Sequence, residues 1–210
     1  DDDGDIDVYV TNDYFLPDYY YVNNGNGTFT DKSNFLLAHT SFYSMGCDAA
    51  DINNDGVLDL AVVDMTPEDH YRNKVLMESM DIKRFRYLHD RLNFTSQYMY
   101  NSLQMGGGYG SFQEVGKAYG VSQSDWSWSA LLADFDNDGF KDYYVTNGFY
   151  RDIKNNDFRK SQKEWEGTPG AQFNEQVFYE FLKMLKSTPI QNQMYKNENG
   201  EKFSNQSTNW

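Results

Sequence analysis

Short runs of β-branched and aromatic residues alternate with polar turns along most of the chain. Runs of this kind at residues 8–11, 60–63 and 143–146 each follow an acidic turn, a pattern typical of β-strands. Residues 43–47 and 126–130 alternate large with small side chains, which also indicates strands. The pattern therefore predicts a mainly β structure.

These segments recur along the chain at a fixed spacing. Residues 21–29, 103–112 and 195–203 each read as a strand, a Gly/Asn-rich turn and a second strand. Residues 29–64 align without a gap with residues 112–147, which lie 83 positions later. Such a period indicates propeller blades, since barrels and sandwiches need no repeat. We expect an all-β fold, a partial β-propeller of about three four-stranded blades, forming one domain over residues 1–210 that is truncated at both ends.

Two insertions interrupt the repeat, at approximately residues 65–98 and 150–190, and both are expected to be mainly helical. Apolar residues recur at helical spacing in 173–185 and, less regularly, in 67–92. The basic residues of the first insertion are interleaved with acidic ones, which predicts a solvated helix face rather than an anion site. These basic residues are Arg72, Lys83, Arg84, Arg86 and Arg91.

An acidic turn occupies the same place in each repeat. Residues 51–59 and 134–142 share the pattern D-x-[DN]-x-D-G-x-x-D, and residues 1–7 match its later part. Oxygen ligands at alternate positions of a tight loop can converge on a hard dication such as Ca²⁺, and the glycine permits the sharp turn. Without a cation, so many neighbouring carboxylates would repel one another.

Two known calcium motifs do not fit these loops. An EF-hand requires a glutamate at the twelfth position between two helices, whereas here that position is Val62 or Val145 inside a predicted strand. A dockerin-like pair fails for a similar reason, because helices should follow its loops. The alternative is that the acidic turns are ordinary solvent-exposed hairpin turns that bind no metal. The presence of three copies in register argues against this alternative.

The acidic signatures combined with the strand-turn-strand hairpins at residues 21–29, 103–112 and 195–203 resemble the FG-GAP/VCBS repeats of integrin-α-like β-propellers. The strings at 7–12, 142–147 and 23–29 look most like the bacterial ASPIC/UnbV and cartilage-acidic-protein group. The resemblance covers about two thirds of the chain and implies calcium-loaded blades on an exported or surface protein, with the metal usually remote from ligand chemistry. The helical insertions are not part of the basic repeat.

Matching the chain to this repeat implies two complete calcium sites and a third, truncated one, whose first ligand would precede the given residues. The ligands would be Asp51, Asn53, Asp55, the Val57 carbonyl and Asp59; Asp134, Asp136, Asp138, the Phe140 carbonyl and Asp142; and Asp1, Asp3, the Asp5 carbonyl and Asp7.

Composition narrows the choice of partners and location. The formal charge of −14 repels a phosphate backbone, so we expect no nucleic-acid partner, and no run of apolar residues is long enough to span a membrane. Calcium loops need the calcium levels found outside the cytosol, which favours an extracellular or cell-surface protein, with the periplasm as an alternative. The single cysteine, Cys47, excludes an internal disulfide and is expected to be buried in a strand.

Catalytic machinery is sparse in this chain. His39, His70 and His89 have no matching nucleophile and are expected in surface or structural roles, so we predict no enzyme. The leading hypothesis is a non-enzymatic module for protein or ligand binding and scaffolding, with the helical insertions contacting another protein or the missing blades. A lyase-like polysaccharide enzyme and a lectin-like glycan-binding module are the alternatives. Exposure of Trp126 or Trp128 would favour the lectin, and their burial in the blade core, the more common outcome, would oppose it.

Overall fold

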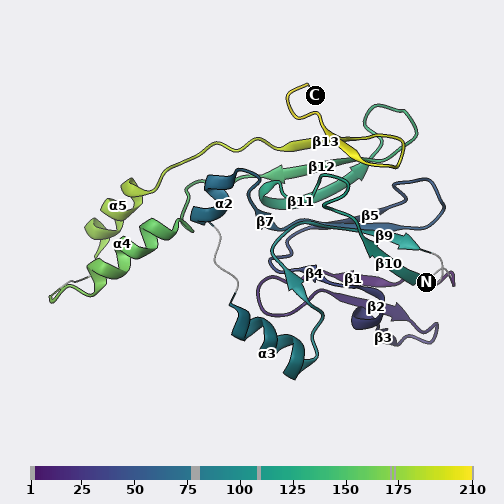
Figure 1. The fold of residues 1–210 in the computed structure, drawn as a ribbon, viewed down its shortest axis with the longest axis horizontal. Coiled ribbons are helices and arrows are strands. Elements are labelled where there is room, and N and C mark those ends of the chain that lie inside the picture. The colour runs from purple at the N-terminus through teal and green to yellow at the C-terminus, as the bar shows by residue number, and fades with distance from the viewer. Residues whose placement is uncertain (1–2, 77–80, 108–109, 171, 173, 210) are drawn as a thin grey trace.

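Strands form most of the regular structure and are gathered into three principal antiparallel sheets (Figure 1). The computed structural model describes residues 3–76, 81–107, 110–170, 172 and 174–209. This architecture agrees with an all-β, propeller-like fold. The first sheet has the order β1-β2-β3, with strands β1 (Val8–Val10), β2 (Tyr19–Asn23) and β3 (Phe29–Asp31).

The second and third sheets are larger and follow the same meander. The second sheet has the order β10-β9-β6-β5, with β5 (Cys47–Ala50), β6 (Asp59–Val62), β9 (Ser102–Gly107) and β10 (Ser111–Glu114). The third has the order β14-β13-β12-β11-β7, with β7 (Met65–Thr66), β11 (Asp125–Ala133), β12 (Asp142–Asn147), β13 (Gln193–Asn197) and β14 (Phe203–Asn205). A short parallel pair joins β4 (Thr40–Ser41) to β8 (Gln97–Tyr98).

Five helices accompany the sheets in the described part of the chain. One short helix, α1 (Ser33–Leu36), follows the first sheet. Helices α2 (His70–Leu76) and α3 (Ile82–Leu92) lie between β7 and β8, and helices α4 (Asn156–Glu166) and α5 (Glu175–Met184) lie between β12 and β13. These two pairs of helices fall within residues 65–98 and 150–190, respectively.

The hydrophobic core lies between neighbouring sheets. One cluster joins residues of the second sheet, including Leu103, to residues of the third, including Tyr143 and Val145, all of which are 1% exposed or less. A smaller cluster of Tyr20, Leu36, Leu37 and Leu60 joins the first sheet to the second. The sheets therefore pack face to face in sequence, as expected for a propeller-like arrangement because each sheet must bury an apolar face against its neighbour.

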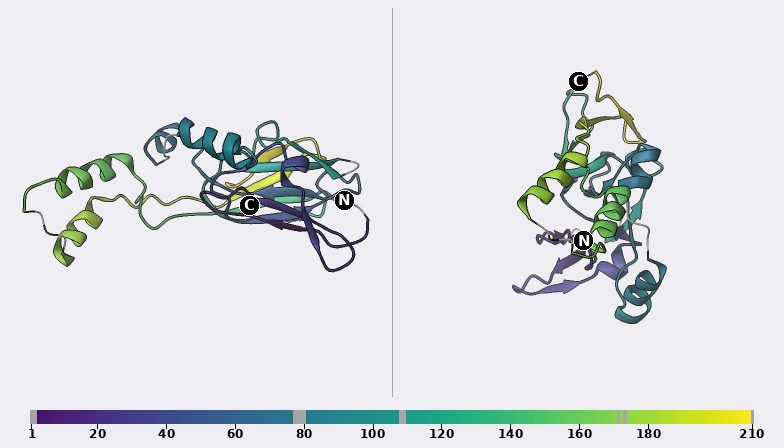
Figure 2. Two further views of the ribbon diagram at one scale, coloured as in Figure 1. Left: turned by 90° about the horizontal axis from the view of Figure 1, so that it is seen from below. Right: turned by 90° about the vertical axis from the view of Figure 1, so that its left-hand side faces the viewer.

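The helical hairpin of α4 and α5 extends away from the sheets, as Figures 1 and 2 show. Asn155 and Asn174 cap the two helices by accepting hydrogen bonds from backbone N–H groups of the first turn. The rings of Phe158 and Trp165 on α4 contact Phe181 on α5 edge to face. The hairpin is thus held by its own aromatic contacts, and neither helix contains a fully buried residue.

Two expectations about the segment before β5 were wrong. Residues 44–46 are not in a strand, although they align with residues of β11. Met45 N–H still donates to the Val63 carbonyl at 2.9 Å, and the Gly46 carbonyl accepts the Val63 N–H at 3.0 Å. Just before them, the buried carboxylate of Asp64 accepts the N–H groups of Phe42 and Tyr43, each at 3.0 Å, so the regular strand begins only at Cys47. Cys47 is exposed rather than buried, at the start of β5, which is an edge strand of the second sheet.

Candidate metal centre

The two complete acidic loops adopt one backbone geometry. In residues 134–142, Asp134 accepts hydrogen bonds from the N–H groups of Asp138 and Gly139 at 3.1 and 2.9 Å, and Asp51 accepts the equivalent pair at the same distances in residues 51–59. Gly139 has a φ of 97°, in the left-handed region that favours glycine. The loop fold is therefore encoded locally, within a few residues of its own aspartates.

Three carboxylates converge in the loop between β11 and β12. One oxygen each from Asp134, Asp136 and Asp138 lies within 4.8 Å of the others. Oxygen atoms at 2.3–2.6 Å from one Ca²⁺ ion, as calcium coordination requires, would lie about this close together. The chemistry and spacing of this donor set therefore fit a hard dication.

A lysine supplies positive charge at the same place. The Lys196 ammonium, from β13, hydrogen-bonds to Asp136 and lies 2.8 Å from Oδ2 of Asp138. Hydrogen bonds to Asp136, and to a smaller extent to Asp138, raise the pKa of Lys196. The hydrogen bond from Lys196 is in turn the main cause that lowers the pKa of Asp138. The ammonium thus marks where a cation is electrostatically favoured, and it would compete with a metal ion for the same oxygens.

The loop at residues 51–59 carries an amide in place of one carboxylate. Asn53 Nδ2 donates to Asp55 Oδ2 at 2.9 Å, and the amide leaves this loop with one carboxylate fewer than the loop at residues 134–142. Asn54 Nδ2 donates to the carbonyl oxygen of Gly139 at 3.1 Å. The two acidic loops are therefore neighbours in space, joined by a direct hydrogen bond.

The closing aspartates of the loops make a contact that the sequence analysis did not foresee. Asp59 and Asp142 are completely buried, and each accepts one backbone N–H from its own loop, at 2.8 and 2.9 Å, respectively. The second oxygen of Asp59 accepts the N–H of Gly106 in β9, and that of Asp142 accepts the N–H of Asn197 in β13. Each closing aspartate thus fastens its loop to the next strand of the sheet, and its role as a metal ligand stays a prediction.

The opening loop repeats this arrangement as far as it is described. Asp7 accepts the N–H of Asn23 in β2 at 2.9 Å, which matches the contacts of Asp59 and Asp142. Asp3 accepts the N–H of Asp5 at 2.9 Å, as Asp55 and Asp138 do in their loops. Asp1 lies outside the described residues. The carbonyls of Asp5, Val57 and Phe140 stay predicted ligands.

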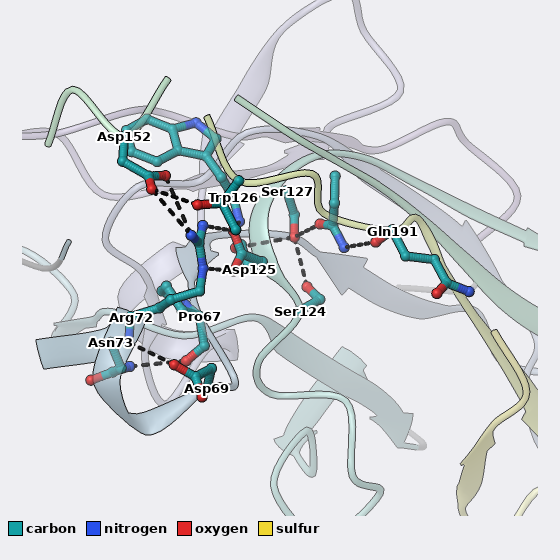
Figure 3. Close-up of polar contacts among 12 residues, drawn as sticks. Pro67, Asp69, Arg72, Asn73, Ser124, Asp125, Trp126, Ser127, Asp152 and Gln191 are labelled. Carbon is teal, nitrogen blue, oxygen red and sulfur yellow. Dashed lines mark hydrogen bonds and ion pairs between the residues drawn. The ribbon is translucent and has the colours of Figure 1, made fainter. Parts of the chain in front are cut away.

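The structure also reveals a charged cluster that the sequence analysis missed (Figure 3). Arg72, on α2, lies between Asp125 at the start of β11 and Asp152 after β12. Its side chain is 15% exposed, and those of the two aspartates are 8% and 11% exposed. Thr188 donates to Asp152 at 2.8 Å. The cluster joins both helical insertions to the third sheet.

Two arginines of the first insertion therefore contradict the expectation of a solvated helix face. Burial opposes the charge of Arg72, but hydrogen bonds to Asp125 and the charges of both aspartates raise its pKa above the ordinary value. The Arg84 guanidinium lies over the Phe15 ring at 4.0 Å and over the Phe42 ring at 4.9 Å. Arg86 and Arg91 are exposed, as expected. The interleaved charges of the sequence gave no signal that distinguished the packed pair, Arg72 and Arg84, from the exposed pair, Arg86 and Arg91.

The tryptophans of β11 differ in exposure. Trp128 is 43% exposed, whereas Trp126 is partly buried. The pairing of β11 with β12 shifts register between Ser127 and Ser129, and such an irregularity leaves Trp128 outside the ladder. Trp128 stacks on Phe149 with an angle of 11° between the ring planes.

The three histidines lie apart from the acidic loops. Burial lowers the pKa of His39, whose Nε2 lies 2.8 Å from the Tyr100 hydroxyl. His70 is exposed at the start of α2, and His89 pairs with the neighbouring Asp90 on α3. These positions are structural or on the surface.

A comparison with known protein families gives a match in the N-terminal part of the chain, which includes the first sheet and its acidic loop. Residues 1–62 match the family model of the FG-GAP-like repeat. The match covers the opening loop, the first sheet and the first complete acidic loop, and it supports the FG-GAP part of the resemblance. No curated protein matches the chain. Within the described residues, no helix has the length and apolar character needed to cross a membrane.

Proposed function

We propose that this chain is a calcium-binding β-propeller repeat module without enzymatic activity, related to the ASPIC/UnbV and cartilage-acidic-protein group. It would serve protein or ligand binding and scaffolding in an exported surface protein. The observation that carries this proposal is the convergence of the Asp134, Asp136 and Asp138 carboxylates within 4.8 Å in a loop whose geometry recurs at residues 51–59.

The metal would have a structural role. Carboxylates of the two complete loops would hold one Ca²⁺ ion each, and the ions would neutralise charge that otherwise loosens the loops. Because Asn54 bonds to the Gly139 carbonyl, ordering one loop would also restrain the other. Calcium would thus stabilise the junction between the second and third sheets, and a requirement for it supports a location outside the cytosol.

The helical insertions are the proposed contact surface for another protein or for further blades. Helix α5 exposes Phe178, Tyr179 and Met184 to 44%, 53% and 60%, respectively. Large apolar side chains gathered on one exposed helix often mark an interaction site. The extension of α4 and α5 away from the sheets makes them accessible (Figure 2).

Glycan binding is a second candidate, and one observation favours it. Trp128 is 43% exposed and Tyr150 is 81% exposed, and the ring of Phe149 stacks on Trp128. Exposed aromatic rings present the flat apolar surface on which sugar rings pack. Loss of oligosaccharide binding in Trp128→Ala, with unchanged thermal stability, would support this candidate.

A calcium titration by calorimetry, paired with thermal melts in calcium and in chelator, tests the principal proposal. We expect binding to two sites in the unaltered protein and a melting temperature that rises with calcium. Asp138→Asn and Asp55→Asn should each remove one site. Glu164→Gln, which neutralises one exposed carboxylate on α4, is the matched control and should titrate like the unaltered protein.

Absence of binding heat, together with identical melts in calcium and chelator, would contradict the proposal. The acidic loops would then be ordinary turns, and the argument for an extracytosolic location would lose its basis.

A further inference from the structure

The three principal sheets pack in a row, with the first sheet at one end and the third sheet at the other (Figures 1 and 2). The first sheet packs on the second around Tyr20 and Leu60, and the second packs on the third around Leu103 and Tyr143. Within the described part of the chain, this order leaves the outer face of the first sheet and that of the third sheet without a neighbouring sheet. The internal repeat allows these two outer faces to be compared with the packed ones.

The outer face of the first sheet matches a face that is packed in the third sheet. Three apolar residues of the third sheet lie in the core against the second sheet and are at most 7% exposed: Tyr143, Val145 and Phe203. The residues at the same places of the first sheet, counted from its closing aspartate and along its hairpin, are Val8, Val10 and Phe29. Val8 and Phe29 are 39% and 48% exposed. The first sheet therefore presents to solvent the apolar face that the third sheet buries.

The outer face of the third sheet matches a packed face of the second. Ile52 and Ala61 are completely buried between the second and third sheets, and their equivalents 83 residues later are Phe135 and Tyr144. Phe135 is 39% exposed. Leu131, which is paired with Tyr144 and so lies on the same face, is 46% exposed.

The contact between the first and second sheets shows that a tyrosine fits at this place. Tyr9 of the first sheet is the second residue after the closing aspartate, as Ala61 and Tyr144 are in their sheets. Tyr9 packs against the cluster that joins the first sheet to the second. The larger side chain of Tyr144 is therefore compatible with the same mode of packing.

The polar contact between packed sheets also has its two halves at the ends of the row. Asn54 Nδ2 in the second sheet's loop donates to the Gly139 carbonyl in the third sheet's loop at 3.1 Å. The equivalent of Asn54 in the third loop is Asn137, and the two have φ values of 60° and 63°. The equivalent of Gly139 in the opening loop is Gly4, with φ values of 97° and 92°. The third sheet thus carries the donor, and the first sheet carries the acceptor.

We propose that a second copy of this chain packs on these two faces, with the first sheet of each copy against the third sheet of the other. The two outer faces are the two halves of the contact that already joins neighbouring sheets within one chain, so each copy offers what the other lacks. Asn137 of one copy then donates to the Gly4 carbonyl of the next. Burial of the two apolar faces drives the association.

The number of sheets selects two copies. Each chain supplies three principal sheets, so two copies supply six, whereas one supplies three and three supply nine. Closed propellers have about four to eight blades, and only two copies fall in this range. The two contacts of such a ring are identical and related by a twofold axis. This contact uses sheet faces rather than the helical insertions, and it goes beyond the proposed function.

Sedimentation velocity on the 210-residue chain, over a series of concentrations, tests the proposal. We expect a reversible equilibrium between one chain and two, with a limiting mass twice that of one chain. The ring has no free outer face, so the mass should not increase further.

One variant on each face then locates the contact. Phe29→Glu and Leu131→Glu each place a charge in both contacts of the ring, because both copies carry the change. Each should weaken the dimer by about a hundredfold or more, which corresponds to about tenfold for each contact. Tyr179→Glu, at a residue of α5 that is 53% exposed, is the matched control and should leave the dimer unchanged.

Mixing the two variants distinguishes this arrangement from other dimers. In a mixed pair, the third sheet of Phe29→Glu and the first sheet of Leu131→Glu are both unaltered, so one of the two contacts is intact. Mixed dimers should therefore form at concentrations at which each variant alone is monomeric.

A chain that stays monomeric at every concentration overturns the proposal, and other blades would then cover the two faces. A mass that increases beyond two copies overturns the closed ring, and loss of the dimer in Tyr179→Glu places the contact on the helical hairpin instead. Failure of the two variants to form a mixed dimer overturns the pairing of first sheet with third. Thermal melts establish that each variant is folded, and Val8→Asn and Phe135→Asn, on the same two faces, replace a variant that is not.

Discussion

The guanidinium of Arg72 meets the carboxylate of Asp125 at two points, with Nε 2.8 Å from Oδ2 and Nη2 2.9 Å from Oδ1 (Figure 3). Asp125 has a φ of 86°, an unusual conformation for a residue other than glycine, and its Oδ1 also accepts the N–H of Trp126. The arginine thus holds the first residue of β11 in a strained conformation while it joins the insertion to the third sheet.

Replacing Arg72 by methionine should destabilise the protein by about 3 kcal/mol, because it leaves Asp125 and Asp152 as poorly compensated, largely buried carboxylates. Arg72→Lys should cost about 1 kcal/mol, since an ammonium cannot reproduce the two-point contact. Urea denaturation measures both, and hydrogen exchange should show loosening at residues 150–155. The exposed Arg86→Met is the control, and equal stability of the two methionine variants would refute the structural role of Arg72.

Lys196→Met should increase the calcium affinity of the loop at residues 134–142. The ammonium of Lys196 bonds to Asp136 and Asp138, so calcium must displace it, and its removal should strengthen binding by roughly two- to fivefold. Calorimetry on Asp55→Asn, in which only this loop is expected to bind, isolates the effect. Lys202→Met, at an exposed position, is the control. Unchanged or weaker binding in Lys196→Met would show that the lysine does not compete with the metal.

Asp142→Asn should destabilise the protein even in chelator. Both carboxylate oxygens of Asp142 accept backbone N–H groups, and an amide nitrogen in one of those places leaves a buried N–H without an acceptor, which costs about 2 kcal/mol. Asp136→Asn changes an exposed loop position and should shift stability in chelator far less. If Asp142→Asn melts like the unaltered protein in chelator, the fastening role assigned to the closing aspartates is wrong.

Stability in chelator should increase as the pH falls from 7.5 to 5. Burial raises the pKa of Asp18 to about 6, against an ordinary value of 3.8, and burial does the same for Asp64. The folded protein therefore takes up protons near pH 6, where the unfolded chain remains ionised. The resulting stabilisation is complete below about pH 4 and is lost as the pH rises through 6, and it amounts to on the order of 3 kcal/mol for one such group.

Asp18→Asn tests that pH dependence. The amide can still accept the N–H of Asn12, and its NH₂ group can donate to the hydroxyls of Tyr9 and Ser44, so the variant should fold. Urea denaturation at pH 5 and pH 7.5 should show a smaller difference in the variant than in the unaltered protein or in Glu164→Gln. An equal difference in all three would exclude Asp18 as a source of the effect.

Local features of this protein followed from the sequence alone. The acidic loops are made by hydrogen bonds between residues at most seven positions apart, such as Asp134 and Gly139 or Phe135 and Asp142, so the spacing of aspartates, asparagines and glycine suffices to specify them. The short strands were also predictable, because β-branched and aromatic residues bounded by turns have few other structures open to them. The convergence of Asp134, Asp136 and Asp138 is a consequence of that local geometry.

Only the tertiary structure decided which charges are buried and what they contact. Arg72 and Asp125 are 53 residues apart, and Lys196 reaches Asp136 across 60 residues, so no local pattern encodes either pair. Arg72 and Arg86 are alike in the sequence, yet one is enclosed between two aspartates and the other faces solvent. The packing of sheets and helices makes that distinction, because burial and partner distance, rather than residue type, set the energy of a charge.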